Sequence, residues 1–189
     1  GAPVQALFDL AGELAERIAL TPAVLSKAER GYRLHSGITP APVKANATGL
    51  DAELTPFAAF CRIALACLEH LQQNHHGALH SEDVEYIHQM RVATRRLRAA
   101  LRLFGPALPP ELHATLRQPI AGLTRQLGEA RDLDVLLGEI VAPVQAALPG
   151  EPRLAALAGQ ITNQRYGVRS AALAMLAAPT YGQMLLSAL

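Results

Sequence analysis

The chain has 189 residues, and half of them are apolar, which excludes a disordered chain and allows one sizeable buried core. Its 17 basic and 16 acidic residues give a net charge of only +1, which excludes a diffuse positive field as the means of attracting an anionic partner. The sequence has no signal-peptide pattern and no uncharged apolar run of about 18 residues, so we expect a cytoplasmic protein that makes no membrane contact. The two cysteines, Cys61 and Cys67, are too few for a disulfide framework and are expected to be buried free thiols.

The first predicted element is an amphipathic helix in "LFDLAGELAERI", with Leu7, Leu10, Ala11, Leu14 and Ile18 at helical spacing. Residues 36–49 are rich in Gly and Pro and show almost no periodicity. We therefore expect this stretch to be a linker.

From residue 50 onward the pattern is helical throughout, and no run alternates with period two. Thr55 and Pro56 are suited to the N-cap and first position of a helix that carries a wide apolar stripe. The segment "HHGALHS" is expected to be a turn, after which Ser81 caps a second helix that ends at Phe104. The predicted fold is an all-α, antiparallel helical bundle preceded by an N-terminal helix and a linker.

A third helical region is expected to start at "LPPELHATL" and to run to Pro143 or a little beyond. Pro119 lies inside it and is expected to kink or restart the helix. Residues 152–178 are predicted to form a fourth helix, and a short final helix follows Pro179.

The segment "HQMRVATRRLRAALRLF", residues 88–104, holds five arginines and no carboxylate. On a helical projection one group of cationic side chains falls within an arc of about 80° and forms a ladder about 21 Å long. The members of this ladder are His88, Arg91, Arg95, Arg98 and Arg102. Met90, Leu97 and Phe104 belong to the opposite, apolar face.

A charged stripe is usually only the solvated face of an amphipathic helix, but such faces normally mix charges of both signs. Here the arginines at i and i+4 repel one another without a neighbouring acid, so we expect an anion to lie along the ladder. After Tyr86, Phe104 is the only aromatic residue in this helix, and the chain has no Trp. The helix therefore offers few aromatic rings on which bases could stack, and we do not expect nucleic acid as the partner. The ladder favours a bare polyanion of repeated phosphates; the alternative is a basic interaction domain for nucleic acid or an acidic protein segment.

The segments "VEYIHQMRVATRRLRAALRLF" and "LGEARDLDVLL" resemble the two motifs of the CHAD domain, the conserved histidine α-helical domain. This resemblance implies two similar helical bundles around a basic surface that binds inorganic polyphosphate. By position it assigns polyphosphate contacts to the five residues of the ladder. The secondary candidates are Arg96, Arg131, Arg125 and Arg62. Asp132 and Asp134 are expected to cap a helix or to pair with arginines, and Asp132 is a possible cap of the following helix.

Residues 1–35 resemble the C-terminal end of a CYTH domain, the triphosphate tunnel enzymes, although the ExExK motif of that family is absent. The expected organisation is a CYTH-like remnant at 1–35, a linker at 36–49 and a CHAD domain at 50–189. The second basic helix of a full CHAD domain has no counterpart before residue 189, so we expect an incomplete domain that self-associates through its exposed bundle face.

The sequence offers no convincing catalytic or metal site. His75, His76 and His80 lack the cysteine or acidic partners of a zinc site and are expected to lie in a solvated turn. Neither a nucleophile–base pair nor a Gly-rich phosphate loop is found. We therefore expect a non-catalytic module without metal or cofactor that binds polyphosphate and is associated with polyphosphate granules. A longer parent protein would be the place for CYTH-type triphosphatase activity.

Overall fold

The computed structural model describes residues 3–189, which are helical apart from short connections and one long extended segment. The helices are α1 (Val4–Ala15), α2 (Lys27–His35), α3 (Pro56–His80), α4 (Glu85–Phe104), a 3₁₀ turn η1 (Gly105–Ala107), α5 (Pro110–Val135), a π-helical turn η2 (Leu136–Val141), α6 (Ala142–Ala147), α7 (Pro152–Ala177) and α8 (Pro179–Ala188). No strand occurs in this part of the chain, which confirms the predicted all-α class.

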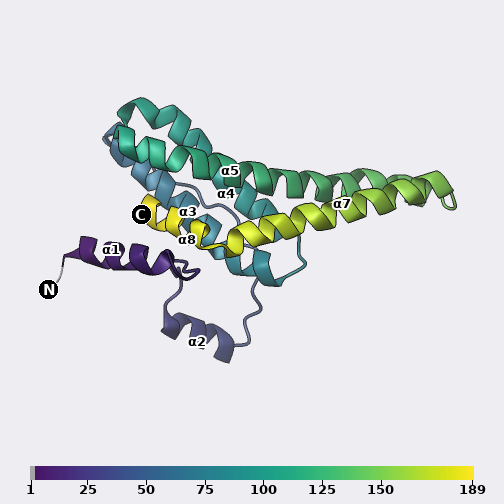
Figure 1. Cartoon of the computed structure of the whole chain (residues 1–189), viewed down its shortest axis with the longest axis horizontal. Helices are drawn as coiled ribbons and strands as arrows, with labels where there is room; N and C mark the ends of the chain where they lie inside the picture. Colours follow the sequence, from purple (N-terminus) through teal and green to yellow (C-terminus); the bar gives the residue numbers. More distant parts are fainter. Residues whose placement is uncertain (1–2) are drawn as a thin grey trace.

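The core lies where α3, α4 and α5 pack together and are covered at one side by the end of α7 and by α8 (Figure 1). Short connections reverse the chain between α3, α4 and α5, so neighbouring helices run antiparallel. The fully buried side chains of this core include Leu68, Ile87, Leu97, Ile120 and Leu185. The predicted apolar face of α4 is confirmed, since Met90 and Leu97 are buried and Phe104 packs against the core.

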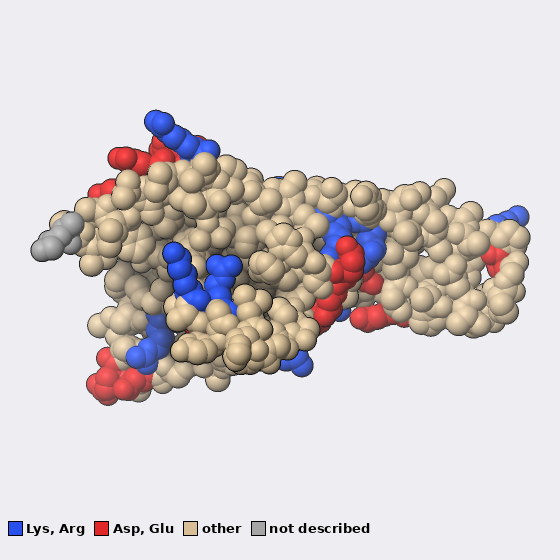
Figure 2. Space-filling view, turned by 90° about the horizontal axis from the view of Figure 1, so that it is seen from below, with Lys and Arg blue, Asp and Glu red and all other residues tan. Residues whose placement is uncertain are grey.

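The last turn of α5, η2, α6 and the first half of α7 form a helical hairpin that projects beyond the bundle (Figure 1). We call this hairpin the arm, residues 131–165. Its surface is mostly uncharged in the space-filling view (Figure 2). At its base, Nε of Arg165 donates to Oδ1 of Asp134 at 2.6 Å and ties α7 to α5. The expected restart at Pro119 does not occur, because α5 continues through this residue without a break.

The turn predicted at "HHGALHS" is wrong, because α3 continues to His80 and the chain reverses only at residues 81–84. A Cβ atom at position 77 would overlap the ring of Tyr86. Gly77, which reads as a turn signal in the sequence, thus serves as a notch in α3 against which the start of α4 packs. Helix α4 then begins at Glu85, whose backbone N–H is bound by Oδ1 of Asp83 rather than by Ser81.

Residues 37–55, which include all but the first residue of the predicted linker, form an extended segment that we call the strap. The backbone N–H of Val43 donates to Oδ1 of Asn74 at 2.9 Å, and Nδ2 of Asn74 donates back to the Val43 carbonyl at 2.9 Å. Nε2 of His70 also binds this carbonyl and lies 3.1 Å from Oε1 of Gln89 on α4. Buried polar side chains of the bundle therefore hold the strap in place.

Helix α1 packs on α8, and Nε2 of Gln183 donates to the Ala15 carbonyl at 3.1 Å. Ala15 is the only α1 residue that becomes fully buried, while Leu7, Leu10 and Leu14 of the predicted apolar face remain exposed. No helix within residues 3–189 combines the length and the apolar character that a bilayer-spanning segment needs.

Candidate anion-binding groove

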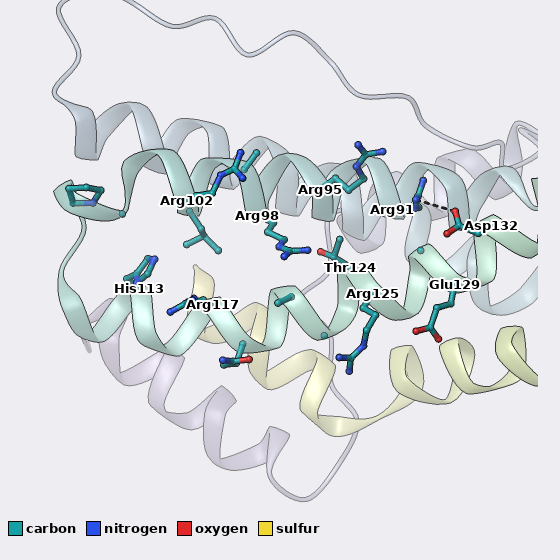
Figure 3. A pocket seen from close by; sticks show the side chains of 18 residues that line it. Arg91, Arg95, Arg98, Arg102, His113, Arg117, Thr124, Arg125, Glu129 and Asp132 are labelled. Carbon is teal, nitrogen blue, oxygen red and sulfur yellow. Dashed lines mark hydrogen bonds and ion pairs between the residues drawn. The ribbon is translucent and has the colours of Figure 1, made fainter.

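A groove with a volume of about 1350 Å³ lies between α4 and α5 and ends at the η1 connection (Figure 3). Cations reach it from both helices. Its arginines are Arg91, Arg95, Arg98, Arg102, Arg117 and Arg125, and His113 is its only histidine. The groove thus concentrates six of the fifteen arginines of the chain on one surface.

Helix α4 positions one wall of the groove because its apolar face is fixed in the core. The side chains at 91, 95, 98 and 102 follow one another at three- and four-residue spacing and so share a face. The opposite wall follows the same rule on α5, where 113, 117 and 125 are separated by one and two turns. The second helix therefore adds two arginines and a histidine to the four arginines of α4.

Carboxylates are confined to one end of the groove. Glu129 and Asp132 are its only acidic lining residues, and both belong to the last turns of α5. Nη2 of Arg91 donates to Oδ1 of Asp132 at 3.2 Å, and the Arg91 side chain passes close to Gly128, where a Cβ would lie 3.5 Å from its Nε. Within residues 3–189, Arg95, Arg98 and Arg102 form no such ion pair.

The face seen from below differs from the groove. There, Lys and Arg side chains occur in small separate groups, several of them beside Asp or Glu (Figure 2). Five of the six groove arginines are largely solvent-exposed and stand without a partner carboxylate in the part of the chain that the structure describes. An anion that entered the groove would therefore meet guanidinium groups whose hydrogen-bond donors are available.

The structure brings four of the five ladder residues together in the groove, but it places His88 outside it. His88 is half-buried, and its Nδ1 is buried without a hydrogen-bond partner among residues 3–189. The helical projection put His88 on the same arc as the arginines, yet the groove ends one turn before it, at Arg91 and Asp132.

The secondary candidates separate into two groups. Arg125 lines the groove. Nη1 of Arg62 donates to the Gly49 carbonyl at 2.9 Å, and Nη2 of Arg96 donates to Oγ1 of Thr48 at 3.2 Å, so both hold the strap. Arg131 lies 3.8 Å from Glu139 and is not a lining residue either. Three of the four secondary candidates thus have contacts outside the groove.

The sequence reasoning missed His113 and Arg117. The signal was present, because Glu111 is the only carboxylate between Glu85 and Glu129 and the two residues are spaced i, i+4. A restart of the helix at Pro119 would instead put residues 108–119 in a separate helical piece. Continuity of α5 is what carries Arg117 and Arg125 onto one wall.

Two further expectations about this region are settled by contacts. Asp132 and Asp134 are partners of Arg91 and Arg165, which confirms the predicted pairing with arginines. The expected cap by Asp132 is wrong, because α5 continues past it to Val135.

The predicted solvated turn around the histidine cluster is also wrong. His75 is half-buried on α3, where Nε2 binds the Leu176 carbonyl at 3.0 Å and the ring stacks on Tyr181. The rings of His76 and His80 lie against each other on an exposed part of α3, with centroids 4.5 Å apart. Within residues 3–189 no three His, Cys, Asp or Glu side chains gather as a metal site requires.

Comparison with known proteins agrees with this architecture. The family model of the CHAD domain matches residues 62–189. The crystal structure of the CHAD domain from the plant Ricinus communis is 37% identical, superimposes with a TM-score of 0.63 and is matched over 77% of this chain. The match spans 48% of the plant domain, so this chain corresponds to about half its length. No curated protein matches the chain.

Neither match supports the resemblance of residues 1–35 to a CYTH domain, which stays a prediction. The helical architecture, the structural likeness and the family model over residues 62–189 lead to one assignment. The chain belongs to the CHAD domain family.

Proposed function

We propose that this chain binds inorganic polyphosphate in the groove between α4 and α5, as a binding module rather than an enzyme. The observation that carries the proposal is the pair of facing cation rows from Arg91 to Arg102 and from His113 to Arg125. Guanidinium groups bind phosphate oxygens in a bidentate way, and a regular row of them suits a ligand that repeats its phosphates.

The lining of the groove favours phosphates over bases. None of its described lining residues is Phe, Tyr or Trp, so a nucleic acid would find no surface on which to stack its bases. Its amide and hydroxyl groups are few, with Gln118 and Thr124 as examples, and do not form the repeated pattern of a base-reading helix. A nucleic acid would therefore be held by its backbone alone.

The test is a calorimetric titration of the whole chain with polyphosphates of several lengths. Arg95, Arg98 and Arg117 are replaced together by glutamate in one variant. A matched control has three exposed arginines outside the groove replaced by glutamate. These are Arg17, Arg30 and Arg153, so the net charge changes by the same amount as in the groove variant. We expect the groove variant to lose at least about 100-fold in affinity and the control to lose much less. Charges in direct contact with the ligand contribute more binding free energy than distant charges, which salt screens.

Circular dichroism of both variants shows whether the bundle is intact. If the two variants weaken binding to the same extent, the net charge and not the groove determines binding. Competition separates the remaining ligands: polyphosphate should displace bound DNA, RNA or an acidic peptide at a much lower concentration of charged groups. The reverse order of displacement would support the alternative, a basic interaction domain.

A further inference from the structure

The imidazole of His113 lies at the end of the groove formed by the connection between α4 and α5. It projects from the first turns of α5 into the groove, across from Arg102 and one turn before Arg117 (Figure 3). A Cβ atom at position 105 would lie 3.4 Å from its Nε2, so the ring rests close to the backbone of Gly105. His113 is half-buried and is thus held at the groove wall while it remains accessible to a ligand.

The charged groups that face His113 are cationic. Arg102 lies across the groove on α4 and Arg117 lies one turn further along α5 (Figure 3), whereas η1 contributes no titratable side chain. Glu111, on the same turn of α5, is exposed and does not line the groove. Glu129 and Asp132 follow 16 and 19 residues later, which places them about 24 and 28 Å away along the helix axis.

The groove therefore offers the imidazole no carboxylate partner at this end. A phosphate chain between Arg102 and Arg117 would reverse the local potential and favour the imidazolium form. Histidine is the side chain that changes charge between about pH 5 and 8, so ligand and proton would bind together in the physiological range. The effect is reciprocal, because a ligand that favours the protonated form must itself bind that form more tightly.

We propose that His113 is a phosphate contact whose protonation is coupled to polyphosphate binding. The proposal rests on the proposed function and adds pH regulation to it. Neutral imidazole can offer the phosphate one N–H donor, but imidazolium offers two donors and a positive charge. Affinity therefore falls as the pH rises. We expect about a fivefold contribution of His113 between about pH 6 and pH 8, the size of one partly exposed ion pair.

The experiment compares wild type, His113→Gln and His113→Arg by calorimetry with one medium-chain polyphosphate at about pH 6, 7 and 8. The terminal phosphates of the ligand also titrate in this range, so the pH dependence of His113→Gln supplies the baseline. We expect wild type to show a steeper loss of affinity than His113→Gln. The variant His113→Arg keeps its charge at every pH, so its pH dependence should match the baseline of His113→Gln while its affinity at pH 8 exceeds that of wild type.

His35→Gln is the matched control, because His35 is exposed on α2 and does not line the groove. It should keep the full pH dependence of wild type. Titration at pH 7 in two buffers of different ionisation enthalpy gives a second measure, since proton uptake on binding should be larger for wild type than for His113→Gln.

The outcomes separate the two proposals. If all forms bind polyphosphate but wild type and His113→Gln share one pH dependence and one proton uptake, the role of His113 is wrong and the groove assignment stands. If folded wild type binds no polyphosphate at any of these pH values, the proposed function fails and the coupling fails with it. Because His113→Arg retains the charge and the hydrogen-bond donors, it tests the coupling even if His113→Gln does not fold.

Discussion

Nη2 of Arg91 lies 3.2 Å from Oδ1 of Asp132, and this pair closes one end of the groove between α4 and α5. The side chain of Asp132 is 70% exposed, whereas that of Arg91 is 25% exposed. Asp132 is therefore in a position to compete with an incoming phosphate for the guanidinium group of Arg91.

Replacing Asp132 by Asn should tighten polyphosphate binding by about threefold to fivefold, since it removes a competing negative charge from the groove. The measurement is the calorimetric affinity at low ionic strength. The control is Asp51→Asn, because Asp51 is exposed and away from the groove, and Asn retains the oxygen that accepts from the Glu53 N–H. A weaker affinity of Asp132→Asn would show that Asp132 positions Arg91 for the ligand instead of competing with it.

Replacing Asp134 by Ala should destabilise the protein by about 2 kcal/mol, because it leaves Arg165 partly buried without its partner. The Asp134 side chain is 4% exposed and that of Arg165 27% exposed, so the value is reduced from that of a fully buried pair. Asp132→Ala breaks an exposed pair and should cost less than about 1 kcal/mol. Urea unfolding followed by circular dichroism compares the two. Equal losses would contradict a structural role for Asp134 at the base of the arm.

Replacing Gly77 by Ala should lower the free energy of unfolding by about 1 to 2 kcal/mol, although alanine is the better helix former. The new methyl group would meet the ring of Tyr86, and overpacking of this kind outweighs the gain in helix propensity. The control is Gly159→Ala, which adds a methyl group with nothing within 4 Å on an exposed part of α7 and should stabilise by up to about 1 kcal/mol. Thermal melts of both variants measure this. A rise in melting temperature for Gly77→Ala would show that α4 does not need the notch.

Burial lowers the pKa of His75, while its hydrogen bond to the Leu176 carbonyl opposes part of that decrease and the neighbouring His76 and His80 add to it. In the unfolded chain, histidine titrates near about pH 6.5, so below that pH the unfolded state binds more protons at this position. A neutral, buried His75 therefore stabilises the folded state above about pH 6.5. This stabilisation is lost as the pH falls from about 6.5 through the lower pKa of His75 in the folded state.

His75→Gln, which keeps a hydrogen-bond donor for the Leu176 carbonyl, should lose less stability than wild type between about pH 7 and pH 5. Chemical denaturation at each pH supplies the comparison. Parallel curves for the two proteins would assign the acid sensitivity to other groups.

Burial raises the pKa of the Cys67 thiol, and nearby Arg96 opposes this effect. Because the thiolate is the reactive form, Cys67 should react at least about tenfold more slowly than the half-buried Cys61 with a thiol reagent at about pH 8. Peptide mapping after timed labelling distinguishes the two positions. In denaturant the labelling rates of the two thiols should converge. Fast labelling of Cys67 in the folded protein would mean that the packing of α3 on α4 opens readily around this residue.

The sequence predicts the parts of this structure that depend on helical periodicity. The apolar face of α4 and the shared direction of Arg91, Arg95, Arg98 and Arg102 follow from the period of 3.6 residues. Periodicity does not say where a groove ends, so it assigns His88 to the ladder although this residue lies one turn beyond the groove.

Other parts of the site depend on contacts between residues far apart in the sequence. Arg62 and Arg96 bind Gly49 and Thr48 of the strap, and no local pattern around either arginine indicates such a partner. His113 joins the groove because η1 turns α5 back along α4. A helical projection of α4 alone therefore predicts neither the strap contacts of the two arginines nor the position of His113.

The amide of Asn74 binds both backbone polar groups of Val43, and His70 links the same carbonyl to Gln89 on α4. The strap therefore contributes to the same cooperative unit as the bundle, since it cannot detach without leaving buried polar groups of α3 unpaired. A segment that looks like a loop in secondary structure should then resist local opening, and the Val43 amide should exchange its hydrogen on the slow timescale of the helices rather than on that of the chain ends.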